Sequence, residues 1–342
     1  MSNNITEPFN PYEWLTNIDS LNFQDKSILI IGSGKMARQY AQALSSMKFN
    51  DVTVISRNND RLSEICNEFG FNQGPNNLED GLTKIKKKDL IIIATSVGSL
   101  LPIAKLVLKN GQNNILIEKP GSLYYQELLE LNEKLNSQKV RIGYNRLAYP
   151  NLHKLKQLVQ DEGGITSCNF FFTELVHTID FDKETEDIYT RWGISNSLHV
   201  ISMAFHLIGL PKEYHFYQSG KLDWHPNGSI FVGSGLTDKN IPFSYHADWG
   251  SSGRWGIEVM TKENAYRLIS LEELLVCHKG SFEWQPVPFK TAYPNVKQGV
   301  AEEVTLMLSK EAENKIPLVT LEKAALFNKI VEKIFGYDSN KQ

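Results

Sequence analysis

The most constraining feature of the sequence is a short apolar run that leads directly into two glycines. Residues 27–31 are rich in isoleucine, and Gly32-x-Gly34-x-x-Ala37 follows them. The first glycine permits a tight turn, the second lets backbone N–H groups approach a pyrophosphate, and the alanine allows close helix packing. Residues 38–47 then have helical spacing. This pattern predicts a strand, a turn and a helix that bind a dinucleotide at the helix N-terminus, the alternative being a glycine turn without a ligand.

The end of the second predicted strand indicates which dinucleotide is bound. Residues 51–57 form that strand, which ends in Ser56 and Arg57. NAD sites usually have an acidic residue here for the ribose 2′-hydroxyl, whereas NADP sites need cations and hydrogen-bond donors around a 2′-phosphate. Arg61 offers a second guanidinium one turn into the next helix. We therefore favour NADP(H), with NAD(H) as the alternative.

Strand and helix patterns alternate through the first 145 residues. Further strands are expected at 89–95, 114–118 and 140–144, and helices at 100–108 and 124–135. The strand runs are apolar on both faces, as in strands covered by helices on each side. This alternation predicts an α/β fold with an N-terminal Rossmann domain, a doubly wound parallel sheet.

The pattern changes after Pro150, where aromatic and polar residues begin to alternate. Strands are expected at 169–175, 229–232, 243–249 and 255–261, and helices at 199–208 and 321–335. Alternation of this kind is typical of strands with one buried face. The second half is therefore predicted to be an α+β domain with a large, mostly antiparallel open sheet.

These patterns divide the chain into three parts. Residues 1–26 are an N-terminal extension, which we expect Tyr12, Trp14 and Leu15 to hold against the body. The dinucleotide-binding domain covers residues 27–146. The substrate-binding and dimerisation domain covers residues 147–342, and its final helix could pack back on the Rossmann domain.

Composition excludes several classes of protein. The formal net charge of −3 over 342 residues argues against a nucleic-acid partner. The three cysteines are far apart and odd in number, and no His or Cys spacing suggests a metal site. The sequence shows neither a secretory leader nor an apolar run long enough to span a membrane, so we expect no membrane partner and a cytoplasmic location.

A second motif lies at the end of a predicted parallel strand, the edge where such sheets hold ligands. Residues 115–120 read Ile-Leu-Ile-Glu-Lys-Pro, which places Lys119 near the expected nicotinamide end. Together with the glycine turn, this Glu-Lys-Pro element resembles the Gfo/Idh/MocA family of NAD(P)-dependent oxidoreductases. The resemblance extends over residues 27–335 and includes residues 143–146 and 196–199.

The resemblance implies hydride transfer between nicotinamide C4 and a carbinol or carbonyl carbon of a sugar or cyclitol. It implies Lys119 and His199 as catalytic residues, because an ammonium can polarise a carbonyl and an imidazole that titrates near neutrality can move a proton. The expected cofactor-binding residues are Gly32, Ser33, Gly34, Lys35, Met36, Ser56, Arg57, Thr95, Ser96, Glu118, Lys119 and Arg146. The expected substrate-binding residues are Lys119, Asn145, Arg191, Trp192, Asn196 and His199. A homodimer or homotetramer is also expected.

The sequence departs from the family pattern around His199. Many members carry an aspartate four residues before this histidine and another three residues after it, where this chain has Ser195 and Ser202. A serine cannot exchange a proton near neutral pH, so the proton path is left open. Glu174, His177, Arg191 and Trp192 precede His199, and Trp249, Arg254 and Trp255 form a second cluster of possible substrate contacts.

We therefore expect an oxidoreductase that acts on a sugar, nucleotide sugar or cyclitol, in the biosynthesis of a surface polysaccharide or modified sugar. A reductase of a C=N bond or of a non-sugar carbonyl is a second possibility. The two serines also leave open a sensor or regulator that binds cofactor without turnover.

Overall fold

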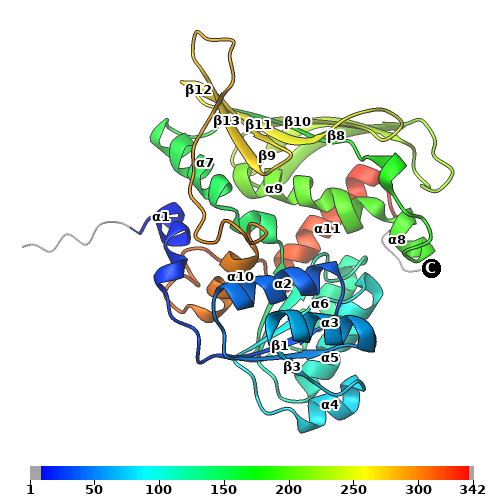
Figure 1. Ribbon diagram of the computed structural model, residues 1–342. Helices are drawn as coiled ribbons and strands as arrows, with labels where there is room; N and C mark the ends of the chain where they lie inside the picture. Colours follow the sequence, from blue (N-terminus) through cyan, green and yellow to red (C-terminus); the bar gives the residue numbers. More distant parts are fainter. Residues whose placement is uncertain (1–8, 339–342) are drawn as a thin grey trace, which may run out of the picture.

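The first lobe of the protein is built around a parallel sheet (Figure 1). A computed structural model describes residues 9–338, so the first eight residues of the predicted extension and the last four of the predicted second domain lie outside the described residues. The six strands are β1 (Ser27–Ile31), β2 (Asp51–Ile55), β3 (Asn72–Gln73), β4 (Leu90–Ile93), β5 (Asn114–Glu118) and β6 (Lys139–Gly143). Their order, β3-β2-β1-β4-β5-β6, confirms the predicted doubly wound sheet.

Both faces of this sheet are covered by helices. The helices are α2 (Lys35–Ser46), α3 (Asn59–Phe69), α4 (Leu78–Lys84), α5 (Val97–Lys109) and α6 (Tyr125–Glu133). Ile28 and Ile30 of β1 share a core with α2 and α3, whereas Leu29 and Ile31 share a core with α5 and α6. Side chains of alternate residues thus point to opposite faces of the sheet, and both faces are buried, which explains why the strand sequences are apolar throughout.

The second lobe contains an eight-stranded sheet. Its strands are β7 (Ser167–Phe172), β8 (Pro211–Ser219), β9 (Ile230–Thr237), β10 (Pro242–Asp248), β11 (Trp255–Met260), β12 (Asn264–Ile269), β13 (Glu273–His278) and β14 (Gln285–Pro286). The order is β14-β13-β12-β11-β7-β10-β9-β8, and β7 with β10 is the parallel pair in an otherwise antiparallel arrangement. Burial alternates along β10, so one face is packed and the other is open. The predicted mostly antiparallel open sheet is confirmed.

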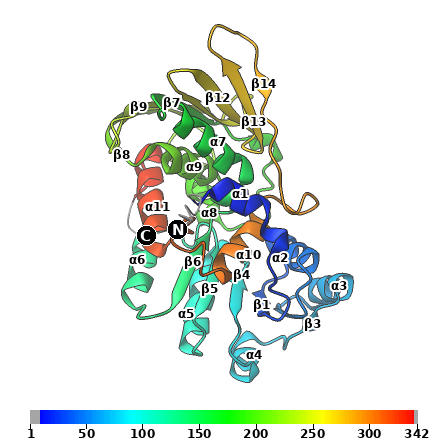
Figure 2. The same cartoon turned by 90° about the vertical axis from the view of Figure 1, so that its left-hand side faces the viewer.

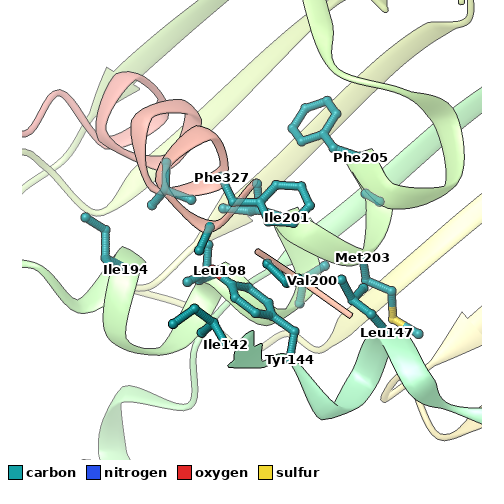
Figure 3. Close-up of a cluster of buried hydrophobic side chains, with 14 of the residues drawn as sticks. Ile142, Tyr144, Leu147, Ile194, Leu198, Val200, Ile201, Met203, Phe205 and Phe327 are labelled. Atoms are coloured by element: carbon teal, nitrogen blue, oxygen red, sulfur yellow. The ribbon is translucent and has the colours of Figure 1, made fainter. Parts of the chain in front are cut away.

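The packed face of the second sheet is covered by α9, which carries the predicted catalytic histidine. The helices and short helical turns of this region are η2 (Asn145–Ala148), α7 (Pro150–Asp161), η3 (Val176–Thr178), α8 (Glu186–Thr190), the π-turn η4 (Gly193–Ser197) and α9 (Leu198–Ile208). Figure 3 shows Leu198, Val200 and Ile201 of α9 among apolar side chains of neighbouring elements. Tyr144 and Phe327, whose ring centroids are 5.6 Å apart, belong to the same cluster. This packing fixes α9 between the two lobes.

Three further helices join segments that are distant in the sequence (Figures 1 and 2). The elements are α1 (Pro11–Thr16), the short turn η1 (Ile18–Ser20), α10 (Val300–Leu308) and α11 (Leu321–Phe335). Helix α1 packs on α7, with Leu15 fully buried. Helix α10 packs on α2, and α11 packs on both α6 and α9. The second half of the chain therefore supplies two helices to the surface of the Rossmann sheet.

Three predicted strands are wrong at their ends: the strand expected at 51–57 ends at Ile55, the one expected at 229–232 continues to Thr237, and the third is β7. The sequence favoured a strand over 169–175, but β7 ends at Phe172. Beyond that residue the Thr173 hydroxyl accepts a hydrogen bond from Asp248 N, 2.9 Å away, and the chain leaves the sheet. Within residues 9–338 no helix has the length and apolarity needed to cross a bilayer. The described side chains form no cluster of three or more metal-ligating groups.

Candidate active site

The turn from β1 to α2 has the geometry that a dinucleotide requires. Gly32 has φ +126, and a Cβ atom there would lie 2.2 Å from the carbonyl oxygen of Ala94, so only glycine fits. At Gly34 a Cβ would meet no protein atom within 4 Å. Gly34 is the N-cap of α2 and has no side chain to satisfy the first helical N–H groups. These N–H groups are therefore free to hold an anion in open space.

A groove of about 940 Å³ runs from this turn along the carboxyl ends of β1, β2 and β4. Among the predicted cofactor-binding residues, its lining contains Gly32, Ser33, Gly34, Lys35, Met36, Ser56, Arg57, Thr95 and Ser96. The structure thus brings these nine residues to one surface. Glu118, Lys119 and Arg146 are not part of this lining and lie toward the second lobe.

The part of the groove beside the end of β2 is polar and basic. Ser33 Oγ lies 2.6 Å from Ser56 Oγ, and Ser56 Oγ accepts a hydrogen bond from Asn58 N at 3.2 Å. Asn58 in turn caps α3 by accepting from Arg61 N. Arg57 and Arg61 are exposed and line the groove. Two guanidinium groups near a pair of hydroxyls can hold a phosphate monoester.

Lys119 follows the last residue of β5 and reaches across to the second lobe. Its Nζ donates a hydrogen bond to the carbonyl oxygen of Ser195, 2.6 Å away in the π-turn. Burial, helped by the nearby cations of Arg146 and Lys297 and opposed by Glu118, lowers the pKa of Lys119 to about 8. A lysine with this pKa can both donate and accept a proton near neutral pH.

The environment of His199 changes the role that the sequence suggested. Burial and the nearby cations of Lys119, Arg146 and Lys297 hold the pKa of His199 well below its usual range. Its Nδ1 has no hydrogen-bond partner among the described residues, and its ring centroid lies 5.9 Å from that of Trp255. The expectation of an imidazole that titrates near neutrality is therefore wrong: His199 is neutral there and suits hydrogen bonding to substrate.

Behind Lys119, a buried carboxyl pair shares one hydroxyl. Tyr40 Oη donates to Glu118 Oε1 at 2.8 Å and lies 3.1 Å from Glu303 Oε2. Burial raises the pKa of Glu303 well above its usual range, and the neighbouring Glu118 adds to the shift. Burial also raises the pKa of Glu118, which Tyr40 and Lys119 oppose, so the two carboxyls compete for ionisation and Glu303 on α10 has the larger tendency to hold a proton. Sequence reasoning missed Tyr40 and Glu303, because neither belongs to a local motif.

A second cavity, of about 630 Å³, opens beside the π-turn. Its walls come from the segment after β7, the segment before α8, the π-turn and the start of β11. Trp192, Asn196 and Trp255 line it, whereas Lys119 and His199 lie just behind the lining, against Ser195 and Trp255 respectively. Aromatic faces beside hydrogen-bonding groups suit a ligand with a ring and hydroxyls.

Glu174 is a buried acid in the wall of this cavity. Its side chain is 4% exposed, and it accepts hydrogen bonds from Asn196 Nδ2 at 2.6 Å and from Ser197 Oγ at 2.5 Å. Burial raises its pKa to about 7, although these two hydrogen bonds and Lys119 oppose the shift. Sequence reasoning named Glu174 as one of several possible contacts but placed it in a strand, where nothing distinguished it.

Arg146 and Asn145 lie at the junction of the lobes. Arg146 forms an ion pair with Glu272 at 3.3 Å, and its guanidinium carbon lies 5.1 Å from the ring centroid of Trp255. Asn145 Nδ2 donates to the carbonyl oxygen of Gln298, 3.0 Å away. Arg146 is thus near His199 and Trp255, whereas the amide of Asn145 is used to hold the loop before α10.

Arg191, a predicted substrate ligand, is instead committed to the protein interior. Its guanidinium pairs with the buried Glu332 of α11 and also donates to the carbonyl oxygens of Leu123 and Asp338. Every guanidinium nitrogen therefore has a protein partner, and we assign Arg191 a structural role. Trp192 does face the cavity and stacks on Tyr189 with centroids 6.0 Å apart.

The remaining candidates divide into two kinds. Arg254 and Trp255 line the cavity. Trp249 is a core residue that is 2% exposed and donates from Nε1 to Phe172 O, and His177 is exposed outside the lining. Of the second cluster of possible substrate contacts, Trp249 thus belongs to the core, whereas Arg254 and Trp255 belong to the cavity wall.

Comparisons by sequence match parts of the chain. The family described as shikimate/quinate 5-dehydrogenase matches residues 15–114. A shikimate dehydrogenase (NADP(+)) of Prochlorococcus marinus is 35% identical over 85 residues, which are 24% of this chain and 30% of that protein. A glutamyl-tRNA reductase of Picrophilus torridus is 32% identical over 114 residues, 32% of this chain and 28% of that protein. The matches thus span less than a third of these relatives.

Comparisons by structure cover both lobes. A UDP-N-acetylglucosamine 3-dehydrogenase of Acidithiobacillus ferrooxidans has a TM-score of 0.70 at 16% identity and covers 92% of this chain and 98% of its own. A dehydrogenase (MviM) of Clostridium difficile has a TM-score of 0.70 at 18% identity, covering 92% and 99%. A levoglucosan dehydrogenase in complex with NADH and L-sorbose has a TM-score of 0.69 at 15% identity, covering 92% and 96%. The chain therefore has the two-domain fold of the Gfo/Idh/MocA-type oxidoreductases.

Proposed function

We propose that this protein is a nicotinamide-dependent oxidoreductase that transfers a hydride to or from a carbinol or carbonyl carbon of a sugar-like substrate. The observation that carries the proposal is the continuity of two cavities. Lys183 and Glu184 line both the dinucleotide groove and the cavity beside the π-turn. Lys119 donates to the backbone of the π-turn, whose Asn196 lines the second of these cavities.

The groove offers each part of a dinucleotide a suitable partner. The N–H groups at the start of α2 would hold the pyrophosphate, and Ser56, Arg57 and Arg61 would hold a 2′-phosphate, so we propose NADP(H) as the preferred cofactor. One relative is named as using NADP(+), whereas one structural neighbour is in complex with NADH. When bound, a nicotinamide dinucleotide supplies or accepts a hydride at ring C4.

Lys119 is the group that would act on the substrate oxygen. Its ammonium can donate a hydrogen bond to a carbonyl oxygen and stabilise the alkoxide that develops during reduction. His199, neutral at physiological pH, would orient the same oxygen or a neighbouring hydroxyl from α9. The cations of Arg146 and Lys297 lower the pKa of both residues and would further stabilise negative charge at this point.

The lining of the cavity favours a sugar ring. Trp192 and Trp255 offer aromatic faces, and Asn196 offers an amide at hydrogen-bond distance from Glu174. Two structural neighbours are named for carbohydrate substrates, UDP-N-acetylglucosamine and levoglucosan. We therefore propose a sugar or nucleotide sugar, handled in the synthesis of a modified sugar.

The proposal is tested by a substrate screen with the purified protein. Nucleotide sugars, free sugars, cyclitols and their keto derivatives are incubated with NADPH, NADP(+), NADH or NAD(+), and the absorbance of reduced nicotinamide is followed. We expect turnover with at least one sugar-like compound, and turnover lower by about 10² or more with Lys119→Met. Tight cofactor binding without turnover of any compound would overturn the proposal and favour a sensor.

A further inference from the structure

The two serines that replace the family's aspartates do not supply a proton path. Ser195 Oγ donates to the carbonyl oxygens of Trp192 and Ile188, at 3.3 and 3.5 Å. Ser202 Oγ donates to the carbonyl oxygen of His199 at 3.3 Å, not to its ring. Both hydroxyls are thus used to hold backbone. Since His199 is neutral and surrounded by cations, it does not supply a proton at neutral pH either.

Glu174 and Lys119 both form hydrogen bonds with the π-turn. Lys119 bonds to the carbonyl oxygen of Ser195, and Glu174 bonds to the side chains of the next two residues, Asn196 and Ser197. The turn therefore holds an acid and a base that are coupled electrostatically. Glu174 also forms part of the cavity lining, so a ligand there would meet it directly.

Glu174 holds the π-turn with both carboxyl oxygens, which accept hydrogen bonds from Ser197 Oγ and Asn196 Nδ2. Burying a carboxyl costs free energy, whereas an amide would offer this turn one acceptor oxygen in place of two. The carboxyl adds the ability to change its protonation state. The closeness of its pKa, about 7, to that of Lys119, about 8, allows a proton to move between the two groups with little change in free energy.

We propose that Glu174 is the second acid–base group of this site, which exchanges with Lys119 the proton that the substrate oxygen gains or loses. The proposal rests on the proposed function. During reduction the carbonyl carbon gains the hydride, and the π electron pair of the C=O bond moves to oxygen. The oxygen takes a proton from the Lys119 ammonium, and the Glu174 carboxyl returns a proton to the resulting amine through an intervening solvent molecule or substrate hydroxyl. Solvent reprotonates Glu174 after product release, and oxidation runs these transfers in reverse.

The charges around Glu174 determine how its protonation depends on pH. Lys119 is the cation that favours its ionised form. Tyr337, whose pKa burial raises far above its usual range, stays neutral, as does His199. The other charged groups of the cavity wall are the exposed residues Asp180, Lys183, Glu184 and Arg254. Reduction needs the protonated form of Glu174, so its rate should fall as pH rises through about 7, whereas the rate of oxidation should rise.

Glu302 provides a matched control. It is a buried glutamate on α10 whose pKa burial also raises to about 7, and it lies outside the cavity lining. In the full-length protein, with the best carbonyl substrate of the screen, we expect Glu174→Gln to lower kcat at least about tenfold and to remove the limb of the pH profile near 7. Glu174→Asp should retain that limb, and Glu302→Gln should leave kcat and the profile unchanged. NADPH affinity should not change in any of these variants.

A second measurement needs no substrate. Carbon-13 NMR of labelled glutamate carboxyls reports each pKa directly, and the resonance lost in Glu174→Gln is that of Glu174. In Lys119→Met its pKa should rise, because a cation that favours the carboxylate is removed. An unmoved pKa, or a Glu174→Gln enzyme with the full rate and an intact limb, would overturn the role of Glu174 while leaving the proposed function standing. Absence of turnover in the unaltered protein would instead reject the proposed function, and the NMR titration would still decide the coupling.

Discussion

Replacing the two glycines of the β1–α2 turn should have different effects: one substitution should weaken cofactor binding and the other should destabilise the fold. Gly34 has φ −79 and ψ −174, values that any residue adopts, and a Cβ there meets no protein atom within 4 Å. Gly34→Val should therefore change the free energy of unfolding by no more than about 1 kcal/mol. The valine would fill the space in which the helix N-terminus meets the pyrophosphate. Loss of two hydrogen bonds to a charged group, each about 1.5 kcal/mol or more, raises the Kd for NADPH about a hundredfold.

Gly32→Ala should instead destabilise the fold. Its φ of +126 costs an alanine about 1 to 3 kcal/mol, and a Cβ 2.2 Å from the carbonyl oxygen of Ala94 would push β1 away from β4. We expect a total loss above about 3 kcal/mol. Denaturant unfolding without cofactor and calorimetric titration with NADPH separate the two effects. A Gly34→Val protein with unaltered NADPH affinity, or a Gly32→Ala protein as stable as the parent, would refute the reasoning.

Four further predictions follow from the site and the core. Arg57→Ala should lower affinity for NADPH at least about tenfold while sparing NADH, as measured by calorimetry, and equal losses for both cofactors would rule out a 2′-phosphate contact. Lys119→Met should lower turnover by about 10² or more at unchanged NADPH affinity, and full turnover would exclude its proposed role. Arg191→Met should destabilise the protein by about 3 to 5 kcal/mol in denaturant unfolding, because Glu332 is left buried without its cation. A raised KM with unchanged stability would instead show that Arg191 binds substrate. Burial lowers the pKa of His225 to about 4, so between about pH 6.5 and 4 the unfolded chain binds more protons than the folded protein. The free energy of unfolding should therefore fall as pH drops through this range. His225→Gln should flatten this fall, and an unaltered slope would contradict the lowered pKa of His225.

The elements that the sequence predicted best are those whose patterns are local. A glycine at 32 is required by backbone geometry within the turn itself, and a strand buried on both faces must be apolar throughout. For the same reason the predicted range 114–118 coincides with β5, and the following lysine could be placed at a strand end. Helix α11 was likewise predicted at 321–335, where its apolar residues recur with helical spacing.

Tertiary structure alone decided what several polar residues do. Arg191 is interior because α11 brings Glu332 to it from the far end of the sequence, and no local pattern distinguishes such an arginine from a substrate ligand. Glu174 turns toward Asn196 because β7 ends two residues before it, a boundary set by the Asp248 contact to Thr173.

The sequence by itself therefore determined the alternation of strands and helices in the first lobe, the glycine turn and the strand end that carries Lys119, since these depend on backbone dihedral angles and on the periodicity of apolar residues. The tertiary structure decided the protonation states of the site. The pKa of His199 is lowered by burial and by cations that come from three separate segments, and that of Glu174 is raised by burial against the π-turn. Burial and charge proximity arise only when distant segments pack together, so no reading of neighbouring residues could have supplied them.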